Sequence, residues 1–472
     1  MTLRGISAGL ACALSLALAA PGHAESQRFA SPASVGDGLL EVKVADALFR
    51  RDGRWLTLGS RVDGDTRETP YLILRTAGGE RVRAVSIATD DGLSWSARSL
   101  APIEGGNDVL VLGIEYDHSD FGALSTLILA RLDANLGLVW SRHLDVPGLW
   151  FESAVLREGA AGEPVVAGIV QHDDGGSLDA GDAFIAGVDL SNGALVAPRT
   201  LGTPDARERI ADAVAIDAGA QALLVEVQRP TSSGLESSDG IATLDAGGAL
   251  ASTTLVGHAL AVGVRAQPQR LLRDGDSWVL AGRRASLGPN FFYLHRLAAD
   301  FTPAATRTLI PFFNAMDVAV RDGGVLLYGE ANGEVMDRGS VLMKLDADFT
   351  IGAQRRYGTE NISFPTGAFA FGDGGLFLAL GALRDEDGFV YESAIRVSND
   401  GEGLLCDEGD YAGFATSSDA PTQPAAWTPT LAALDVQTSD TAAAASELAL
   451  GDVAFCAAQD ERLFRHGFDS EI

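Results

Sequence analysis

The stretch Asp317–Asn332, DVAVRDGGVLLYGEAN, followed by Gly339–Gly358, GSVLMKLDADFTIGAQRRYG, decides the fold. Each half contains two short apolar runs separated by a turn-forming sequence, RDGG in the first half and LDAD in the second. Short runs rich in Val, Leu and Ile, bounded by Gly and Asp, predict β-strands joined by tight turns. One such unit therefore predicts four strands, with a longer polar loop between the second and the third.

Two patterns from this unit recur along the chain. The Leu-Asp-Ala turn, or a degenerate copy of it, returns at spacings of 48 to 57 residues, at Arg75, Leu132, Val188, Leu244, Leu297, Leu345 and Val397. A short apolar run that ends in Gly precedes it, at Gly59, Gly113, Gly168, Gly282, Gly329 and Gly381, with Glu226 in place of the Gly in the remaining copy. Both patterns therefore occur seven times, once in each unit.

This repetition predicts an all-β fold, a seven-bladed β-propeller with four-stranded antiparallel blades over residues 39–405. A single unit cannot bury both of its apolar faces, whereas units arranged in a ring cover each other. The alternative is an open β-solenoid, whose coils are usually shorter and lack two long loops in each unit.

The repeats resemble those of the SBBP and delta-repeat propellers of exported bacterial proteins. Those units share a Leu-Asp-Ala-x-Gly turn and the sequence Asp-Gly-Gly-x-Leu-Leu-x-Gly, which Asp322–Gly329 matches. The resemblance covers roughly residues 39 to 405. Because its motifs are structural, it implies a propeller fold and an exported setting, and no particular chemistry.

The N-terminal region is expected to direct export. Residues 1–24 are predicted to be a signal peptide, because Arg4 precedes the short apolar stretch Ile6–Ala20 and small residues follow it. No later segment is apolar enough to span a bilayer, so we expect a secreted, periplasmic or cell-surface protein without a transmembrane segment. Residues 25–38 are predicted to be a polar leader. Leu39–Val44, or the segment GLLC that ends at Cys406, is expected to complete the seventh blade and close the ring.

The C-terminal region differs in composition from the repeats. Residues 406–456 are rich in Ala, Thr, Ser and Asp and begin and end with cysteine. In an oxidising compartment, Cys406 and Cys456 are expected to form a disulfide that brackets this extension; two buried free thiols are the alternative. Residues 457–472 form a tail that ends LFRHGFDSEI, which resembles a short terminal motif of exported proteins of Gram-negative bacteria.

The formal net charge of −29 limits the partners of the protein. Because such an acidic surface repels the phosphate backbone, we do not expect nucleic acid as a partner. The ligand is expected to be extracellular or periplasmic, and the chain is expected to be a monomer.

Acidic residues cluster in the loops predicted between the second and third strands of a blade. Carboxylate oxygens that converge on one face of the ring could hold a cation, for which Ca²⁺ is the expected ion. The candidate ligands are Asp63, Asp65, Asp117, Asp120, Asp173, Asp174, Asp385 and Asp387. The alternative is a solvated acidic rim without a bound ion.

Two histidines occupy equivalent loops of neighbouring units. His118 and His172, with the adjacent carboxylates, predict a site for Zn²⁺ or another transition metal, and two unrelated surface histidines are the alternative. The chain has no sequence motif for a catalytic nucleophile, a metalloprotease or a phosphate-binding loop. We therefore expect a module that binds a protein, a glycan or a cation on its long-loop face. The alternative is an exported hydrolase or lyase whose active site is assembled from several blades.

Overall fold

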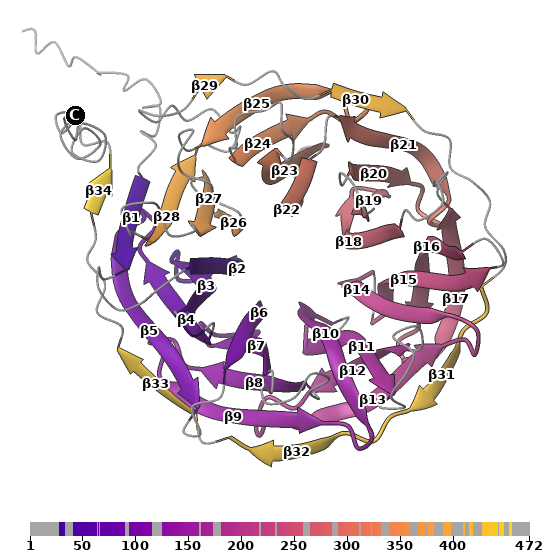
Figure 1. Cartoon of the computed structure of the whole chain (residues 1–472), viewed down its shortest axis with the longest axis horizontal. Coiled ribbons are helices and arrows are strands. Elements are labelled where there is room, and N and C mark those ends of the chain that lie inside the picture. The colour runs from indigo at the N-terminus through magenta and orange to yellow at the C-terminus, as the bar shows by residue number, and fades with distance from the viewer. Residues whose placement is uncertain are drawn as a thin grey trace, which may run out of the picture.

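A computed structural model of the chain shows a β-propeller, with sheets arranged in a ring (Figure 1). Within the described residues every regular element is a strand, and no helix long and apolar enough to cross a bilayer occurs among them. The structure describes residues 28–33, 41–63, 65, 67–89, 94–115, 125–159, 162–172, 181–216, 219–231, 234–257, 265–285, 291–310, 313–321, 323–331, 340–357, 366–372, 375–381, 390–397, 409–410, 415–418, 427–441, 443–447 and 453–455.

The strands form seven antiparallel sheets, numbered here from the innermost strand of each outward. Sheet 1 contains β2 (Glu41–Phe49), β3 (Trp55–Val62), β4 (Glu68–Arg75) and β5 (Arg81–Thr89). Sheet 2 contains β6 (Trp95–Pro102), β7 (Val109–Glu115), β8 (Thr126–Leu132) and β9 (Leu138–Asp145). Sheet 3 contains β10 (Leu149–Glu158), β11 (Pro164–His172), β12 (Gly181–Val188) and β13 (Leu195–Gly202).

The remaining sheets follow the same order from the channel outward. Sheet 4 contains β14 (Arg207–Ala215), β15 (Gln221–Thr231), β16 (Gly234–Leu244) and β17 (Leu250–Gly257). Sheet 5 contains β18 (Arg265–Asp274), β19 (Ser277–Ala285), β20 (Phe291–Leu297) and β21 (Pro303–Ile310). Sheet 6 contains β22 (Phe313–Arg321), β23 (Gly324–Ala331), β24 (Ser340–Leu345) and β25 (Ile351–Tyr357). Sheet 7 contains β26 (Thr366–Gly372), β27 (Gly375–Gly381), β28 (Val390–Val397) and β1 (Arg28–Ala33).

The core lies between neighbouring sheets. The second strands are almost wholly buried, as in β7, where every residue from Val109 to Glu115 is buried. One cluster joins Leu112 and Leu129 of sheet 2 to Phe151 and Phe184 of sheet 3. Strands that are buried on both faces carry continuous apolar runs, which explains the apolar-then-Gly pattern of the sequence. The repeated Leu-Asp-Ala anchors, in turn, are the last residues of the third strands, from Arg75 in β4 to Val397 in β28.

The glycines of that pattern are required where the backbone is crowded. A Cβ on Gly59 would lie 2.4 Å from the carbonyl oxygen of Lys43 and 2.4 Å from the hydroxyl of Tyr71. A Cβ on Gly282 would lie 2.4 Å from the hydroxyl of Tyr293, which occupies the same place in sheet 5. A side chain at these positions would therefore displace either the first strand or a buried tyrosine.

The predicted four-stranded blade is wrong for six of the seven sheets, which contain five strands. The fifth strands come from the C-terminal extension, which runs around the outside of the ring (Figure 1). They are β29 (Gly409–Asp410) on sheet 6, β30 (Ala415–Ser418) on sheet 5, β31 (Thr430–Ala433) on sheet 3, β32 (Gln437–Asp440) on sheet 2, β33 (Ala443–Glu447) on sheet 1 and β34 (Val453–Phe455) on sheet 7. We call these six strands, together with Trp427, the belt.

The belt was missed in the sequence for a physical reason. Its strands are two to five residues long, and the side chains of β32 are exposed throughout, so no apolar periodicity marks them. Their contribution is to the backbone: each pairs with the outermost strand of a sheet, whose N–H and C=O groups would otherwise be unpaired. The extension therefore contributes strands to the ring itself, which the prediction of four-stranded blades did not include. Cys406 and Cys456 lie outside the described residues, so the disulfide stays a prediction.

The ring is closed by the polar leader. All six residues of β1 pair with β28, from Arg28 opposite Ile395 to Ala33 opposite Val390. The expectation that Leu39–Val44 or the GLLC segment closes the ring is wrong, because Glu41–Phe49 forms the innermost strand of sheet 1. The sequence of β1, RFASPA, has little apolar content and contains Pro32, so it does not predict a strand. The predicted signal peptide and the C-terminal tail lie outside the described residues.

Trp427 anchors the belt beside sheet 4, which has no fifth strand in the described part of the chain. The side chain is buried, and its ring covers Gly240 of β16, where a Cβ would lie 2.7 Å from it. The Thr253 hydroxyl of β17 donates a hydrogen bond of 3.1 Å to the backbone oxygen of Trp427. A packed indole thus holds the belt where strand pairing does not.

We expect Trp427→Ala to lower the free energy of unfolding by roughly 3 kcal/mol or more, the usual cost of truncating a buried aromatic side chain. Urea denaturation of the full chain measures the change, and limited proteolysis reports whether the belt is released. Thr428→Ala is the matched control, because Thr428 is the exposed neighbour in the belt. Equal stability of the two variants would contradict the role assigned to Trp427.

Glu208 of β14 is the partner of this indole. Its Oε1 atom accepts hydrogen bonds from the Trp427 Nε1 (3.3 Å), the Thr203 hydroxyl (2.7 Å) and the Thr203 backbone N–H (3.1 Å). The side chain is buried, and burial raises its pKa from 4.5 to about 7, while the hydrogen bonds from Thr203 and Trp427 act in the opposite direction. The folded chain therefore retains a proton on Glu208 over a pH range in which the unfolded chain has lost it.

This difference predicts a specific pH dependence. The free energy of unfolding should fall as the pH rises from 4.5 to about 7 and then level off. Glu208 accounts for a loss of about 3 kcal/mol, because one pKa unit corresponds to about 1.4 kcal/mol. Glu208→Gln should remove this part of the dependence, and the stability difference between variant and wild type, measured by urea denaturation from pH 5 to pH 8, isolates it from other carboxylates. A difference that does not vary with pH would sink the assignment.

Candidate functional site in the central channel

The innermost strands present equivalent positions to the centre of the ring, one from each sheet. The strand register identifies them as Asp46, Ser99, Val155, Asp212, Arg270, Asp317 and Ala368. In five of the seven, all but Val155 and Ala368, the residue directly follows a β-bulge. A bulge changes the direction of the next side chain, which explains how polar residues reach the channel from strands that pack on both faces.

The aspartates at these positions join neighbouring sheets. Asp46 Oδ2 accepts a hydrogen bond of 2.8 Å from the backbone N–H of Leu100 in sheet 2. Asp212 Oδ2 accepts one of 2.9 Å from Leu271 in sheet 5. A carboxylate on one innermost strand thus binds the backbone of the next, and such charged acceptors are stronger than neutral ones.

The same type of contact continues around the channel. Asp317 Oδ2 accepts a hydrogen bond of 2.9 Å from the backbone N–H of Phe369 in sheet 7. Between sheets 2 and 3 the Ser99 hydroxyl donates to the backbone oxygen of Leu156 at 3.0 Å. Between sheets 3 and 4 the Arg157 guanidinium forms an ion pair with Asp212. The centre of the ring is therefore a polar network and not an apolar core.

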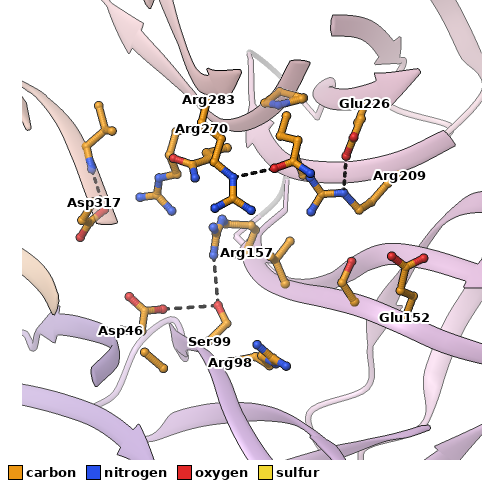
Figure 2. Close-up of a pocket in the computed structure, with 18 of the residues that line it drawn as sticks. Asp46, Arg98, Ser99, Glu152, Arg157, Arg209, Glu226, Arg270, Arg283 and Asp317 are labelled. Carbon is orange, nitrogen blue, oxygen red and sulfur yellow. Dashed lines mark hydrogen bonds and ion pairs between the residues drawn. The ribbon is translucent and has the colours of Figure 1, made fainter. Parts of the chain in front are cut away.

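Arg270 lies within this network as its cationic member. Burial lowers the pKa of Arg270, but the carboxylates of Asp212, Asp317 and Asp46 together outweigh burial and raise it above its usual value. Those three side chains come from sheets 4, 6 and 1, so the guanidinium links them electrostatically across the channel. Figure 2 shows Arg270 with Asp317 and Asp46 on the same side of the cavity.

A cavity of about 480 Å³ opens from this network along the channel. Arg207 and Arg265, which line it, are the first residues of β14 and β18, and Gln228 and Arg283 lie near the ends of β15 and β19. These strand ends lead into the connections between sheets and between second and third strands. The cavity therefore lies in the half of the channel nearest to the long connections.

Arginine dominates the lining of this cavity (Figure 2). Among the described residues, seven arginines line it, against four carboxylates. The arginines are Arg98, Arg157, Arg207, Arg209, Arg265, Arg270 and Arg283, and the carboxylates are Asp46, Glu152, Glu226 and Asp317. All seven arginines come from sheets 2 to 5, and Arg270 is the one that lies beside Asp46 and Asp317.

Some of these arginines are neutralised within the protein. Arg209 Nε donates to Glu226 Oε2 at 2.7 Å, and Arg207 forms an ion pair with Glu152. Gln228 and Gln171 donate further hydrogen bonds to Glu226 and Glu152, respectively. The carboxylates of Glu152 and Glu226 are thereby fixed as partners of sheet 4 arginines.

The arginines of sheet 5 are less fully partnered. Arg265 is exposed and makes no hydrogen bond or ion pair with the described residues. The buried Nε of Arg270 has no hydrogen-bond partner among them. Among the described residues, Arg283 donates one hydrogen bond, from its Nε to Gln267 Oε1 at 2.6 Å. Burial lowers the pKa of Arg283, and the like charge of Arg209 lowers it further, against the opposing effect of Glu226. An anion placed between these groups would relieve that cost.

The residues predicted as cation ligands are not brought together in the described part of the chain. Asp63 and Asp65 lie in the turn after β3, where Asp63 Oδ1 accepts hydrogen bonds from the backbone N–H groups of Asp65 (3.0 Å) and Arg67 (2.9 Å). His172 is the last residue of β11, and its side chain is not described. The remaining candidates, Asp117, Asp120, Asp173, Asp174, Asp385, Asp387 and His118, lie outside the described residues. Among the residues that are described, no group of three or more His, Cys, Asp or Glu side chains is placed to hold a metal ion.

Sequence reasoning missed the arginine-lined cavity. A signal was present, because RERIAD (207–212) and RAQPQR (265–270) place charged residues inside first strands that are otherwise small and apolar. In a propeller the first strand lines the channel, so charges within it indicate what the channel holds.

No family model matches the chain, and no curated protein matches it. Solved structures with a similar fold include the polysaccharide lyase Uly1, with 9% identity and a TM-score of 0.46 over 78% of this chain and 91% of that one. The β-propeller domain of the Trilobed protease from Pyrococcus furiosus has 8% identity and a TM-score of 0.43 over 79% and 100%. A xylan β-1,4-xylosidase from Bacillus halodurans has 10% identity and a TM-score of 0.34 over 90% and 97%. At these values the likenesses carry no argument about activity or ligand.

The network at the channel centre yields a stability prediction. Asp212→Ala removes the acceptor of the Leu271 N–H and the partner of Arg157, and breaking a buried ion pair costs about 3–5 kcal/mol. We expect the free energy of unfolding, measured by urea denaturation, to fall by that amount and the midpoint to fall with it. Asp205→Ala, an exposed carboxylate that precedes the same strand, should leave the midpoint unchanged. Similar midpoints for the two variants would show that the network does not join the sheets.

Proposed function

We propose that the protein is a binding module for a small anionic ligand, which is seated in the channel cavity. The observation that carries this proposal is the group of sheet 5 arginines, Arg265, Arg270 and Arg283, which line the cavity with donors that the described residues leave unused. Guanidinium groups suit carboxylate, sulfate and phosphate oxygens because they present several donors in one plane. A partly enclosed site of this size lies within the usual range of volumes for small-molecule pockets.

The charge of the cavity supports this proposal. The whole chain carries a formal net charge of −29, yet the described residues that line the cavity include seven positive groups and four negative ones, an excess of three positive charges among them. In a partly enclosed site the local groups dominate the potential, because interactions there are screened less than at the surface. The site therefore favours anions although the protein as a whole is acidic.

The contacts of the carboxylates in the cavity are better explained by a binding site than by the active site of a hydrolase. Burial raises the pKa of Asp317, as a general acid would require. Its two oxygens, however, accept the backbone N–H groups of Val318 and Phe369 at 2.8 and 2.9 Å, so this carboxyl holds two sheets together. Glu152 and Glu226 are held by arginine and glutamine partners. Among the described residues of the cavity, the alternative of an exported hydrolase or lyase thus has no carboxyl that is placed to donate a proton to a substrate.

The exported setting of the protein and its binding of metal ions are proposed from the sequence alone. The predicted signal peptide places the protein outside the cytoplasm, where a monomeric propeller would meet extracellular or periplasmic ligands. Weak binding of Ca²⁺ by the acidic loops, and of a transition metal by His118 and His172, stays a prediction beside it.

The proposal is tested by thermal melts with phosphate, sulfate, citrate and galacturonate, each matched in ionic strength with chloride. We expect at least one of these anions to raise the melting temperature of the wild type. Arg265→Gln and Arg283→Gln should each weaken binding of that anion roughly 10- to 100-fold, because each removes a charge-assisted hydrogen bond. Arg51→Gln is the matched control, since Arg51 is exposed in the turn after β2, away from the cavity. No shift with any anion, or equal losses in all three variants, would refute the proposal.

A further inference from the structure

We propose that the anion is a sugar acid, a hydroxyl-rich molecule with one or two carboxylates. This inference rests on the proposed function and assigns the chemical class of its ligand. It follows from the distribution of charge, from the polar groups and from the side chains that line the cavity.

The charge of the cavity is divided between two sides. The arginines come from sheets 2 to 5, whereas sheets 1, 6 and 7 contribute Asp46 and Asp317 with small aliphatic residues. A ligand that carries negative charge at every end would therefore meet carboxylates on the far side. A ligand with one anionic end, directed at Arg265 and Arg283, and an uncharged end avoids that repulsion.

The far side is also unsuited to a cationic group. Asp46 and Asp317 already accept hydrogen bonds from backbone N–H groups. Both carboxylates also lie close enough to Arg270 to raise the pKa of its guanidinium. An ammonium group placed there would have to compete with Arg270 for two carboxylates that already have partners. Hydroxyl groups can share the remaining lone pairs of the carboxylates without adding charge, so a hydroxyl-bearing end is favoured over a zwitterion.

The other polar groups of the lining match hydroxyls. Ser99, Ser153, Gln228, Gln267 and Gln269 all line the cavity, and Gln269 has no hydrogen bond to the described residues. Amide and hydroxyl side chains both donate and accept, which is what recognition of several hydroxyl groups requires. They are distributed over sheets 2 to 5, between the arginines.

The apolar part of the lining argues against two other classes of anion. It consists of alanine, valine and proline side chains, and no aromatic residue is among the described residues that line the cavity. A nucleotide would lack a stacking partner for its base, and its polyphosphate would exceed the small positive excess of the site. A fatty acid would find no continuous apolar surface for its chain, because arginine and glutamine interrupt it.

The experiment is calorimetric titration of the full chain with D-galacturonate and digalacturonate as probes. The comparison ligands are D-galactose, inorganic phosphate, ATP and γ-aminobutyrate, all at the same ionic strength. We expect the uronates to bind at least tenfold more tightly than each comparison ligand. Tighter binding of phosphate or ATP would overturn the sugar-acid inference and leave the anion-binding function standing, as would tighter binding of the zwitterion. Equal binding of galactose and galacturonate, or no binding at all, would overturn both.

Two variants locate the bound ligand. Arg265→Gln should weaken galacturonate binding roughly tenfold and leave the weak binding of galactose unchanged, because it removes one charge-assisted contact. Arg265 is exposed and unpartnered, so this variant keeps the fold. Gln269→Ala should weaken galacturonate and galactose alike and leave phosphate unchanged, because an amide recognises hydroxyl groups. Unchanged galacturonate affinity in both variants would overturn the inference.

Discussion

Each sheet of this protein has two apolar faces and an outer edge of unpaired backbone groups, and the structure depends on covering both. The faces are buried by neighbouring sheets, as Leu112 and Phe151 show between sheets 2 and 3. Face burial alone would leave a row of open strand edges around the ring, which are sites of aggregation. The belt supplies the missing partners, and β1 joins the first sheet to the last. The two ends of the chain thus do the same work, because both convert an edge into a paired strand.

The ring imposes a second requirement at its centre. Each innermost strand is an edge strand that faces the channel, so the N–H groups of Leu100, Leu271 and Phe369 have no neighbouring strand of their own sheet to pair with. Aspartates of the preceding sheets accept them. Those carboxylates in turn require cations, which explains Arg157 and Arg270 at the same level. The charged cavity is therefore a consequence of how the sheets are joined, and the unused donors of sheet 5 are what remains after that requirement is met.

The sequence predicts the repeated part of the fold well, because burial on both faces produces a continuous apolar run in every unit. The anchors Leu132 and Leu297, for example, each end a third strand. The belt and β1 were not predictable in this way, because their contribution is made by the backbone and leaves no side-chain pattern. Glu226 illustrates a subtler limit. The strand register places Val225, opposite Gly240, where five of the other sheets have glycine, and Glu226 one residue further along. The apparent substitution of a glycine by a glutamate is a shift of one position that places the glutamate in the cavity.

The candidate site was only partly predictable for a related reason. The acidic loops can be recognised in the sequence because their charged residues are adjacent along the chain. Arg209 and Arg283, in contrast, become neighbours only through the packing of sheets 4 and 5. The positive charge of these arginines, inside a protein whose net charge is negative, has a further consequence for the ligand. A long polyanion would have to lie across the acidic exterior before it reached the channel, and it would be repelled along its length. At physiological ionic strength screening acts over roughly 8 Å, so a small anion inside the channel experiences mainly the arginines around it. The acidic exterior thus excludes large polyanions, and the arginines inside the ring attract small anions. The position of the arginines within the ring therefore determines which anions can bind.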